Sequence, residues 1–319
     1  MMSVDVVREV VAAEKRIRSH LSPTELEYSP RLSNLNGGRV YLKLENLQPT
    51  GSFKVRGALN AMLTMDPARR DRGVVASSSG NHGLAIAYGA KTLGAPCTVF
   101  VPEGASAMKT DAMAELGAEV RRNGHDVADT ETFAREWARE HDQEYVSPYN
   151  DPHVIGGQGT IATELGQQLL QVDAIYVAVG GGGLASGVAA YAKSVFEGVQ
   201  IVGATPSNSA AMADSVEAGR IVEVASMPTL SDGTAGGIEP GSITFDLCRE
   251  LVDRFVRVSE AEIATATLLF LEWHQMMIEG AAGVAIAAFL QTSGDMQGKD
   301  VVIIVCGENV GQATLDAVL

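Results

Sequence analysis

Short apolar runs alternate with helix-like stretches along most of this 319-residue chain, and the alternation limits its fold more than any other feature. Runs at 73–79, 96–102 and 118–124 are each followed by a stretch of helical character. Further strand-like runs cover 39–45, 173–183, 199–206 and 299–309. Apolar strands separated by helices are typical of a mainly parallel sheet covered on both faces. The sequence therefore predicts an α/β fold.

The distribution of these runs predicts two lobes. Residues 73–142 hold at least three strand–helix units, and a second group of strands follows residue 170. We expect a small domain over 73–142. A large, discontinuous domain is expected to consist of 1–72 and 143–319, with the active site in the cleft between the two.

Charge and composition exclude several classes of protein. The chain has 24 Lys and Arg residues against 39 Asp and Glu residues, and its formal net charge of −15 argues against nucleic-acid and anionic-membrane partners. No run reaches the ~18 apolar residues that a membrane span needs, and the charged, amphipathic start does not resemble a secretion signal. The three cysteines are widely spaced and form neither a disulfide framework nor a CxxC metal site. We therefore expect a cytoplasmic protein.

Lys54 lies in the segment GSFKVRGALN (51–60), in a short polar turn that opens a helix. A lysine nucleophile needs a neutral amine, and an apolar neighbour such as Phe53 would favour that form. An isolated lysine is most often a solvated surface residue. The segment therefore indicates chemistry only in combination with other motifs.

The segment SSSGNHG (77–83) follows an apolar strand-like run. Small residues at the carboxyl end of a strand let the backbone approach a ligand, and the N–H groups of the next helix bind anions such as a carboxylate. Asn81 adds both a donor and an acceptor. Alone, this is an ordinary glycine-rich turn, in which His82 would more often pack than act as a base.

The segment VGGGGLASG (179–187) places four glycines between a buried strand and a helix. Its open backbone N–H groups predict a phosphate-binding loop. A P-loop signature is missing, GxGxxG is not followed cleanly, and no acidic residue ends a strand ~20 residues later, which disfavours a nicotinamide site. Cys306 ends the apolar run VVIIVC (301–306), at the sheet edge where α/β ligands bind, although a buried cysteine is usually a small hydrophobic residue.

In this order and spacing, the four segments resemble the fold-type II PLP-dependent enzymes, which are tryptophan synthase β-like, in the branch of threonine and serine dehydratases and serine racemase. The resemblance covers nearly the whole chain and implies pyridoxal 5′-phosphate (PLP) as the cofactor. It implies cofactor contacts from Phe53, Lys54, Asn81, Gly180, Gly181, Gly182, Gly183, Leu184, Gly233 and Cys306. It implies substrate contacts from Ser78, Ser79, Asn81 and His82.

The same resemblance implies a role for several of these residues. Lys54 forms the Schiff base and then removes the Cα proton, while Ser79 faces the opposite side of Cα. Asn81 reaches the 3′-hydroxyl of PLP, the glycine loop holds the phosphate, and Gly233 flanks the cofactor's other side. Cys306 lies beside the pyridine nitrogen. A thiol is a poor proton source for that nitrogen, which favours β-elimination over transamination.

The implied reaction converts a small β-hydroxy amino acid into a 2-oxo acid and ammonia. Racemisation through Ser79 stays open as an alternative, and β-replacement ranks lower. L-Threonine, L-serine and threo-3-hydroxyaspartate are candidate substrates; the stretch 231–245 also resembles dehydratases of hydroxyectoine breakdown. We expect Tyr149 to Asp151, Thr234 to Ile238 and Glu279 to shape the substrate side-chain pocket. The resemblance also implies a homodimer.

Two functions of other kinds compete with this interpretation. A catalytically silent PLP- or amino-acid-binding protein would carry the same motifs, and glycine turns alone would fit a nicotinamide oxidoreductase. Metal-dependent relatives bind a divalent cation through a Glu and an Asp, where this chain has Thr205 and Ala211. We therefore expect no divalent metal there, while a monovalent ion stays open. The chain ends at Leu319, so we expect no C-terminal regulatory domain and a catabolic role.

Overall fold

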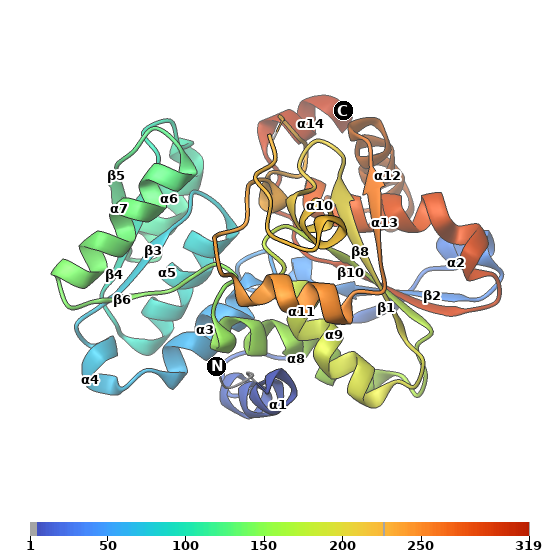
Figure 1. Cartoon of the computed structure of the whole chain (residues 1–319), viewed down its shortest axis with the longest axis horizontal. Helices are drawn as coiled ribbons and strands as arrows, with labels where there is room; N and C mark the ends of the chain where they lie inside the picture. Colours follow the sequence, from blue (N-terminus) through green and yellow to red (C-terminus); the bar gives the residue numbers. More distant parts are fainter. Residues whose placement is uncertain (1–4, 226, 319) are drawn as a thin grey trace.

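Two sheets, each with its own covering helices, divide the chain into a small lobe and a large lobe (Figure 1). The computed structural model describes residues 5–225 and 227–318, so residues 1–4 of the predicted N-terminal helix lie outside the described part. Both sheets are mainly parallel. The predicted α/β fold with two lobes is therefore confirmed.

The large lobe is built on a six-stranded sheet in which only the first pair of strands is antiparallel. In sheet order the strands are β1 (Leu26–Tyr28), β2 (Arg39–Leu44), β10 (Asp300–Val305), β7 (Ala174–Ala178), β8 (Gln200–Pro206) and β9 (Arg254–Val258). In β10, Val302 lies opposite Tyr41 on one side and Ile175 on the other. Residues 301–305 are buried and consist of Val and Ile, as expected of a central parallel strand.

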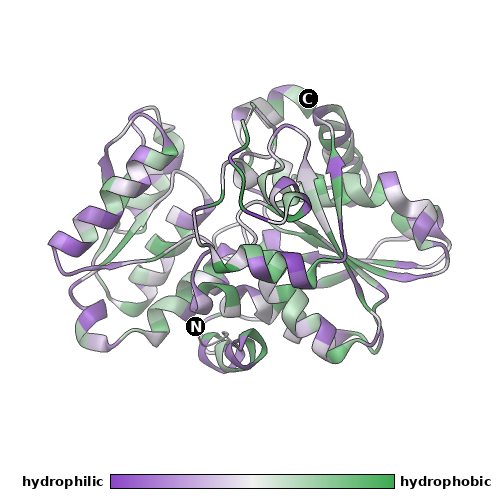
Figure 2. Ribbon diagram, viewed as in Figure 1, coloured by the Kyte–Doolittle hydropathy of each residue, from purple (hydrophilic) through white to green (hydrophobic). Residues whose placement is uncertain are grey.

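Helices cover both faces of this sheet. On one face α13 (Gly280–Thr292) contacts β7, β8 and β10. On the other, α9 (Gly183–Val195) contacts β7 and packs against α8 (Pro152–Gln168), which in turn contacts α1 (Val6–Ile17) (Figure 1). The other helical elements of the lobe are α2 (Pro30–Asn36), η1 (Glu45–Leu47), α10 (Ala211–Ala218), η2 (Asp232–Thr234), α11 (Ile243–Leu251), α12 (Glu260–His274), η3 (Ser293–Met296) and α14 (Gln312–Val318). Apolar residues concentrate on the strands between these layers (Figure 2).

The small lobe is built on a four-stranded parallel sheet. Its strands, in sheet order, are β5 (Glu119–Arg122), β4 (Cys97–Val101), β3 (Val74–Ser77) and β6 (Glu144–Tyr145). Its helices are α4 (Pro67–Arg70), α5 (Asn81–Leu93), α6 (Ala107–Glu115) and α7 (Val127–Glu140). β6 lies just beyond the predicted boundary at residue 142 and pairs with β3. The domain boundaries themselves stay a prediction.

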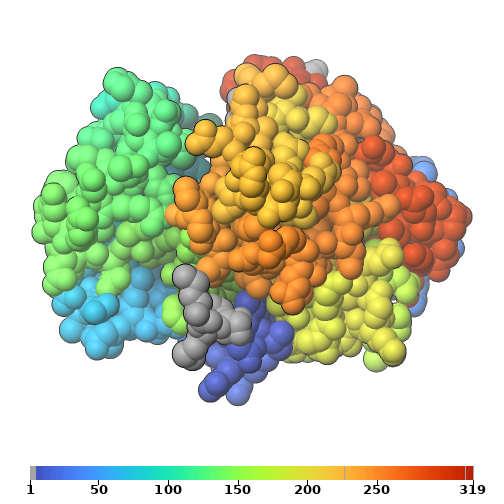
Figure 3. Space-filling model, in the orientation of Figure 1, coloured from blue at the N-terminus to red at the C-terminus, as the bar shows by residue number. Residues whose placement is uncertain are grey.

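Helix α3 (Lys54–Thr64) joins the two lobes. Ser52, just before it, forms an isolated antiparallel bridge with Gly307 of the large lobe. Leu59 and Met62 of α3 instead belong to the hydrophobic core of the small lobe. Lys54 therefore lies where the chain passes from one lobe into the other, and on the face shown in Figure 3 the surface is hollowed between the lobes. Among the described residues, no helix is long and apolar enough to cross a membrane.

Candidate active site

Lys54 is the first residue of α3 and lies beside the segment that follows β10. The N–H of Phe53 donates to the carbonyl oxygen of Cys306 at 3.0 Å, which joins the lysine segment to the end of that strand. The Nζ atom of Lys54 donates to the carbonyl oxygen of Pro148 at 2.9 Å and lies 5.4 Å from the centre of the Phe53 ring. The structure therefore brings Phe53, Lys54 and Cys306 together.

The surroundings of Lys54 favour its neutral form. Burial lowers the pKa of Lys54 to about 8, although the nearby Glu279 and Cys306 act in the opposite direction. A carbonyl oxygen, which carries no full charge, accepts the amine's hydrogen bond. A lysine with this pKa is neutral often enough near pH 8 to act as a nucleophile or a base.

The SSSGNHG segment connects β3 to α5 as predicted. Gly80 occupies the position before α5, and no side chain caps the N–H groups of this helix end. The hydroxyl oxygen of Ser78 accepts from the N–H of Gly80 at 3.1 Å, whereas Ser79 is partly exposed. His82 is buried, and its Nε2 lies 2.9 Å from the carbonyl oxygen of Val146. Burial lowers the pKa of His82 to about 3, so this ring is neutral and packs within the turn.

Asn81 links three segments that are distant in the sequence. Its Nδ2 donates to Oε2 of Glu279 at 2.7 Å, and its Oδ1 accepts from Nδ2 of Asn309 at 2.7 Å. Asn309 also donates to the carbonyl oxygen of Thr50, at 2.9 Å. We did not predict Asn309 as a site residue. Its position directly after the apolar strand β10, at the same sheet edge as Cys306, was the available signal.

The glycine loop between β7 and α9 has the geometry of an anion-binding loop. A Cβ on Gly181 would lie 2.5 Å from the Tyr149 ring, and one on Gly180 would lie 2.8 Å from the backbone of Thr234. Gly182 has a φ of 85°, in the left-handed region that favours glycine. In the described part of the chain, the N–H groups of Gly180, Gly181 and Gly182 have no hydrogen-bond partner. They are therefore open to a ligand at the start of α9, where Gly183 and Leu184 already belong to the helix.

Side chains of helix α11 contact backbone carbonyl oxygens of this loop. The hydroxyl of Thr244 donates to the carbonyl oxygen of Gly181 at 2.6 Å. The thiol of Cys248 lies 3.8 Å from the carbonyl oxygen of Gly182, within reach of a weak hydrogen bond. The sequence offered no motif that marks Thr244 or Cys248, and we did not predict them.

The turn at 148–150 lies between Lys54 and the glycine loop. Pro148 accepts the hydrogen bond from the Lys54 amine, and the next residue, Tyr149, packs its ring over Gly181 and its backbone and Cβ against Gly183. The Tyr149 hydroxyl accepts from the N–H of Glu239 at 2.9 Å. Tyr149 therefore lies against the loop backbone, although we expected it to shape a substrate pocket.

Glu279 lies against Cys306 and near Gly233. The Sγ atom of Cys306 is 3.6 Å from Oε1 of Glu279, and a Cβ on Gly233 would be 3.6 Å from the same oxygen. Glu279 contacts Asn81, which we predicted for both cofactor and substrate, and the predicted cofactor residue Cys306; its place in the substrate pocket stays a prediction. A carboxylate directly before the apolar helix α13 was the available signal of burial.

Thr205, at one of the two positions where we expect no divalent metal, is buried. Its hydroxyl oxygen has no hydrogen-bond partner in the part of the chain that the structure describes. Over residues 5–225 and 227–318, no group of three or more His, Cys, Asp or Glu side chains could hold a metal ion.

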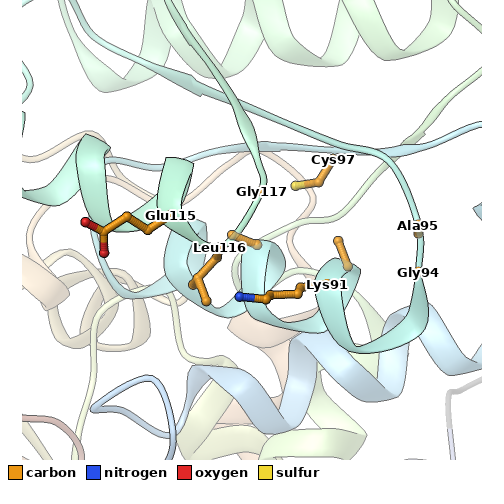
Figure 4. Close-up of a pocket in the computed structure, with 9 residues that line it drawn as sticks. Lys91, Gly94, Ala95, Cys97, Glu115, Leu116 and Gly117 are labelled. Atoms are coloured by element: carbon orange, nitrogen blue, oxygen red, sulfur yellow. The ribbon is translucent and has the colours of Figure 1, made fainter.

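A separate pocket of about 320 Å³ opens on the small lobe (Figure 4). Cys97 of β4, Lys91 of α5 and Leu116 after α6 are among its lining residues. None of the predicted site residues lines this pocket. It therefore lies apart from the cluster around Lys54.

Comparison with known sequences gives the same family over nearly the whole chain. The family described as "Pyridoxal-phosphate dependent enzyme" matches residues 17–307. The chain is 39% identical to an L-threonine ammonia-lyase of Thermotoga maritima, over 100% of this chain and 78% of that protein. It is 38% identical to an L-threo-3-hydroxyaspartate ammonia-lyase of Saccharomyces cerevisiae, over 97% of this chain and 94% of that protein.

Solved structures give the same result. The processed form of threonine deaminase isoform 2 from Solanum lycopersicum superposes with a TM-score of 0.94 at 31% identity, covering 100% of this chain and 93% of that one. Maize serine racemase superposes with a TM-score of 0.91 at 31% identity, covering 97% and 95% of the two chains. Both likenesses extend over the two lobes.

Proposed function

The chain belongs to the family of pyridoxal-phosphate dependent enzymes, and on that premise we propose that it is an ammonia-lyase of small β-hydroxy amino acids. It removes water from the substrate and releases a 2-oxo acid and ammonia. One observation carries the proposal. The turn at 148–149 contacts both the amine of Lys54 and the open glycine loop, so a reactive amine and a phosphate site lie next to each other.

The residues of this site fit PLP. The three open N–H groups of Gly180 to Gly182 suit its phosphate, and the Lys54 amine suits its aldehyde carbon. Asn81 and Cys306 would hold the hydroxyl and nitrogen edges of the ring, with Phe53 and Gly233 on its two sides. When bound, PLP supplies an electron sink for the charge that develops at Cα.

The chain's own residues bind the substrate and move its protons. The uncapped start of α5, with Ser78 and Ser79, binds the substrate carboxylate, because open N–H groups and hydroxyls are donors to an anion. Lys54 removes the Cα proton, and its lowered pKa leaves a neutral amine available for this step. The lobes enclose the reacting atoms and limit their contact with water.

The relatives suggest the substrate. L-Threonine is the first candidate because the Thermotoga maritima relative is an L-threonine ammonia-lyase, and threo-3-hydroxyaspartate is the second because of the yeast relative. L-Serine is the third candidate substrate. A dehydratase of hydroxyectoine breakdown stays a prediction from the stretch 231–245.

Racemisation is the second candidate function, and the likeness to maize serine racemase favours it. The Ser79 hydroxyl makes no hydrogen bond within the described part of the chain, so it is free to exchange a proton with substrate. The Ser79→Ala variant should lose racemisation and keep much of the elimination. Equal loss of both reactions would argue against this role for Ser79.

We also propose a homodimer in the cytoplasm, by analogy with the family. Light scattering coupled to gel filtration tests the dimer. A mass of one chain at micromolar concentration would contradict it.

Borohydride reduction followed by peptide mapping tests the proposed function. The purified protein should absorb visible light from its bound cofactor, and reduction should fix the label on Lys54. An assay of 2-oxo acid over the three substrates, with and without potassium and magnesium, should then show turnover without magnesium. A label on another lysine, or no turnover in a labelled protein, would contradict the proposal.

A further inference from the structure

Glu279 is a buried carboxyl group that forms no ion pair within the described part of the chain. It is 3% exposed and occupies the position before α13, where it caps no backbone N–H with its side chain. Oε2 accepts from Asn81 at 2.7 Å, and Oε1 lies 3.6 Å from the Cys306 thiol. A Cβ on Gly307 would approach the carboxyl group within 2.7 Å, so this glycine leaves the space that Glu279 fills. A buried carboxylate without an ion pair is costly, and such groups concentrate at functional sites.

The direction of the hydrogen bonds around Glu279 is fixed by the backbone. A carbonyl oxygen can only accept, so the atom of Asn309 that faces the Thr50 carbonyl is its Nδ2. The same Nδ2 faces Asn81, which must therefore present its Oδ1 to Asn309 and its Nδ2 to Glu279. Asn81 thus always donates to Glu279. A carbonyl or carboxylate oxygen accepts a hydrogen bond better than a hydroxyl oxygen does, so the bond from Asn81 to Oε2 favours a proton of Glu279 on Oε1, on the side of Cys306.

Four ionisable groups surround the carboxyl group of Glu279: Lys54 of α3, Lys109 of α6, Asp232 of η2 and the Cys306 thiol. The pKa of Glu279 is raised to about 7: burial raises it most and the charge of Asp232 adds to this, while the hydrogen bonds from Asn81 and Cys306 and the charge of Lys109 lower it. Burial also raises the pKa of the Cys306 thiol well above its usual value, so the thiol keeps its proton. Glu279 and Cys306 together therefore carry one proton above neutral pH and two protons below it.

We propose that Glu279 is a positioning residue that determines which acceptor receives the hydrogen bond from the Cys306 thiol. When Glu279 is ionised, the thiol donates to it. When Glu279 is neutral, Glu279 donates to the sulfur and the thiol donates to the ring nitrogen of PLP. No covalent bond changes in Cys306, because the only proton gained or lost is on the carboxyl group. The placement of Cys306 at the ring nitrogen rests on the proposed function.

The consequence for chemistry is a cofactor whose electron demand depends on Glu279. A hydrogen bond to the ring nitrogen draws electron density from the ring, so the neutral state of Glu279 makes PLP the stronger electron sink. In the ionised state, the sulfur offers the nitrogen only lone pairs. The hydrogen bond that Cys306 makes to the cofactor therefore depends on the protonation state of Glu279, 27 positions earlier in the chain.

The infrared S–H band of Cys306 tests the proposal in the protein without cofactor. Subtracting the spectrum of the Cys306→Ser variant isolates this band from those of Cys97 and Cys248. A charged acceptor makes a stronger hydrogen bond than a neutral one, so the band should shift to lower frequency as pH rises. The midpoint should lie at about pH 7.

The Glu279→Gln variant should remove this titration. Because Asn81 always donates, the glutamine oxygen must face Asn81 and its amide N–H must face Cys306, which imitates the neutral acid. The Cys306 band should then be independent of pH and remain at its low-pH position. The Asp232→Asn variant is the matched control: it removes a neighbouring charge, so the band should still titrate, with a lower midpoint.

Two outcomes separate this proposal from the proposed function. A band that stays fixed in the wild-type protein from well below to well above pH 7, or that titrates equally in Glu279→Gln, would overturn the role of Glu279 even in a protein that binds PLP. A titrating band in a protein that binds no PLP would support the thiol switch and overturn the proposed function. If the Glu279→Gln variant does not fold, the proposal is tested by the pH titration of the Cys306 S–H band in the wild-type protein, with Cys306→Ser as the reference. In the loaded enzyme, the chemical shift of a ¹⁵N-labelled ring nitrogen should follow the same midpoint.

Discussion

At the scale of single residues, the position of Lys54 explains how an ordinary amine becomes reactive. Its Nζ donates to a carbonyl oxygen, and burial lowers its pKa to about 8. An ion pair with a carboxylate would have stabilised the charged amine instead. The side chain is therefore prepared for covalent attachment before any cofactor arrives.

We expect the attachment of PLP to the cofactor-free protein to accelerate as pH rises through about 8. Only the neutral amine attacks a carbonyl carbon, and the neutral fraction grows as pH approaches and passes the lysine pKa. Borohydride trapping at several pH values measures the rate. Lys54→Arg should trap no cofactor, while Lys91→Arg in the separate small-lobe pocket should behave as the wild type. A trapping rate that does not change with pH would contradict the expectation.

Some site residues were predictable from the sequence because they lie in short contiguous motifs. Lys54 and Gly180 to Gly183 belong to this group, since turn chemistry and strand ends mark them locally. Glu279 and Asn309 do not, because they contact Asn81 from 198 and 228 residues away. A sequence pattern can show that Glu279 is buried, but the partner of a buried carboxyl group depends on how distant segments meet.

At the scale of elements, α11 supports the glycine loop from outside the predicted motif. Thr244 holds the carbonyl of Gly181, and the start of α11 is itself fixed by the side-chain oxygen of Asn150, which accepts from the N–H of Ile243 at 2.9 Å. The loop is thus held between α11 on one side and Tyr149 on the other. Thr244 and Ile243 of α11, which belong to no predicted site motif, therefore help to hold the loop that carries the open N–H groups.

The Thr244→Val variant should weaken PLP binding about fivefold, because it removes one hydrogen bond worth ~1 kcal/mol from the loop. Titration of the cofactor-free protein, followed by visible absorbance, measures this affinity. The turnover number at saturating PLP should change little, since Thr244 acts only through the loop. Thr265→Val, on the exposed face of α12, is the matched control. Unchanged affinity in Thr244→Val would show that the loop holds its shape without α11.

The structure has a strand in each predicted run, including β2 and β5, which contain charged residues. β1 has only three residues and was not predicted. β9 was not predicted either, and Arg254 and Arg257 interrupt its apolar pattern. It is an edge strand, and Arg257 pairs with Asp214 and Glu217 at the surface. β6 was missed because two residues are too short to show a period.

At the scale of the whole molecule, a buried ionic network lies close to Lys54 in the chain. Arg56, two residues after Lys54, is completely buried and pairs with Glu45 at 2.7 Å and with Glu164 at 2.6 Å. Lys43 of β2 joins the network through Glu164, at 2.7 Å. The network connects α3 to α8 and to the sheet of the large lobe. It therefore fixes the position of the helix that begins with Lys54.

Replacing Arg56 with Met should destabilise the protein by about 3–5 kcal/mol, because it leaves the buried carboxylate of Glu45 without its cation and removes one of the cations that pair with Glu164. Denaturation by urea measures this loss. Arg69→Gln is the control: Arg69 is exposed and pairs with Glu144 at the surface, and an exposed ion pair contributes at most about 1 kcal/mol. A loss in Arg56→Met no larger than that of the control would mean that the buried network is not needed for stability.

The pairing of β2 with β10 also has a consequence for the order in which the protein forms during synthesis. Arg39 lies opposite Asp300, roughly 260 residues later in the chain, whereas the small-lobe sheet uses only strands between Val74 and Tyr145. At about 5–20 residues per second, the ribosome needs tens of seconds to add the last strand after β2 has emerged. The small lobe can fold in that interval. Lys54 meets Cys306 only after β10 has been synthesised, so a nascent chain that has not reached β10 has no assembled cofactor site.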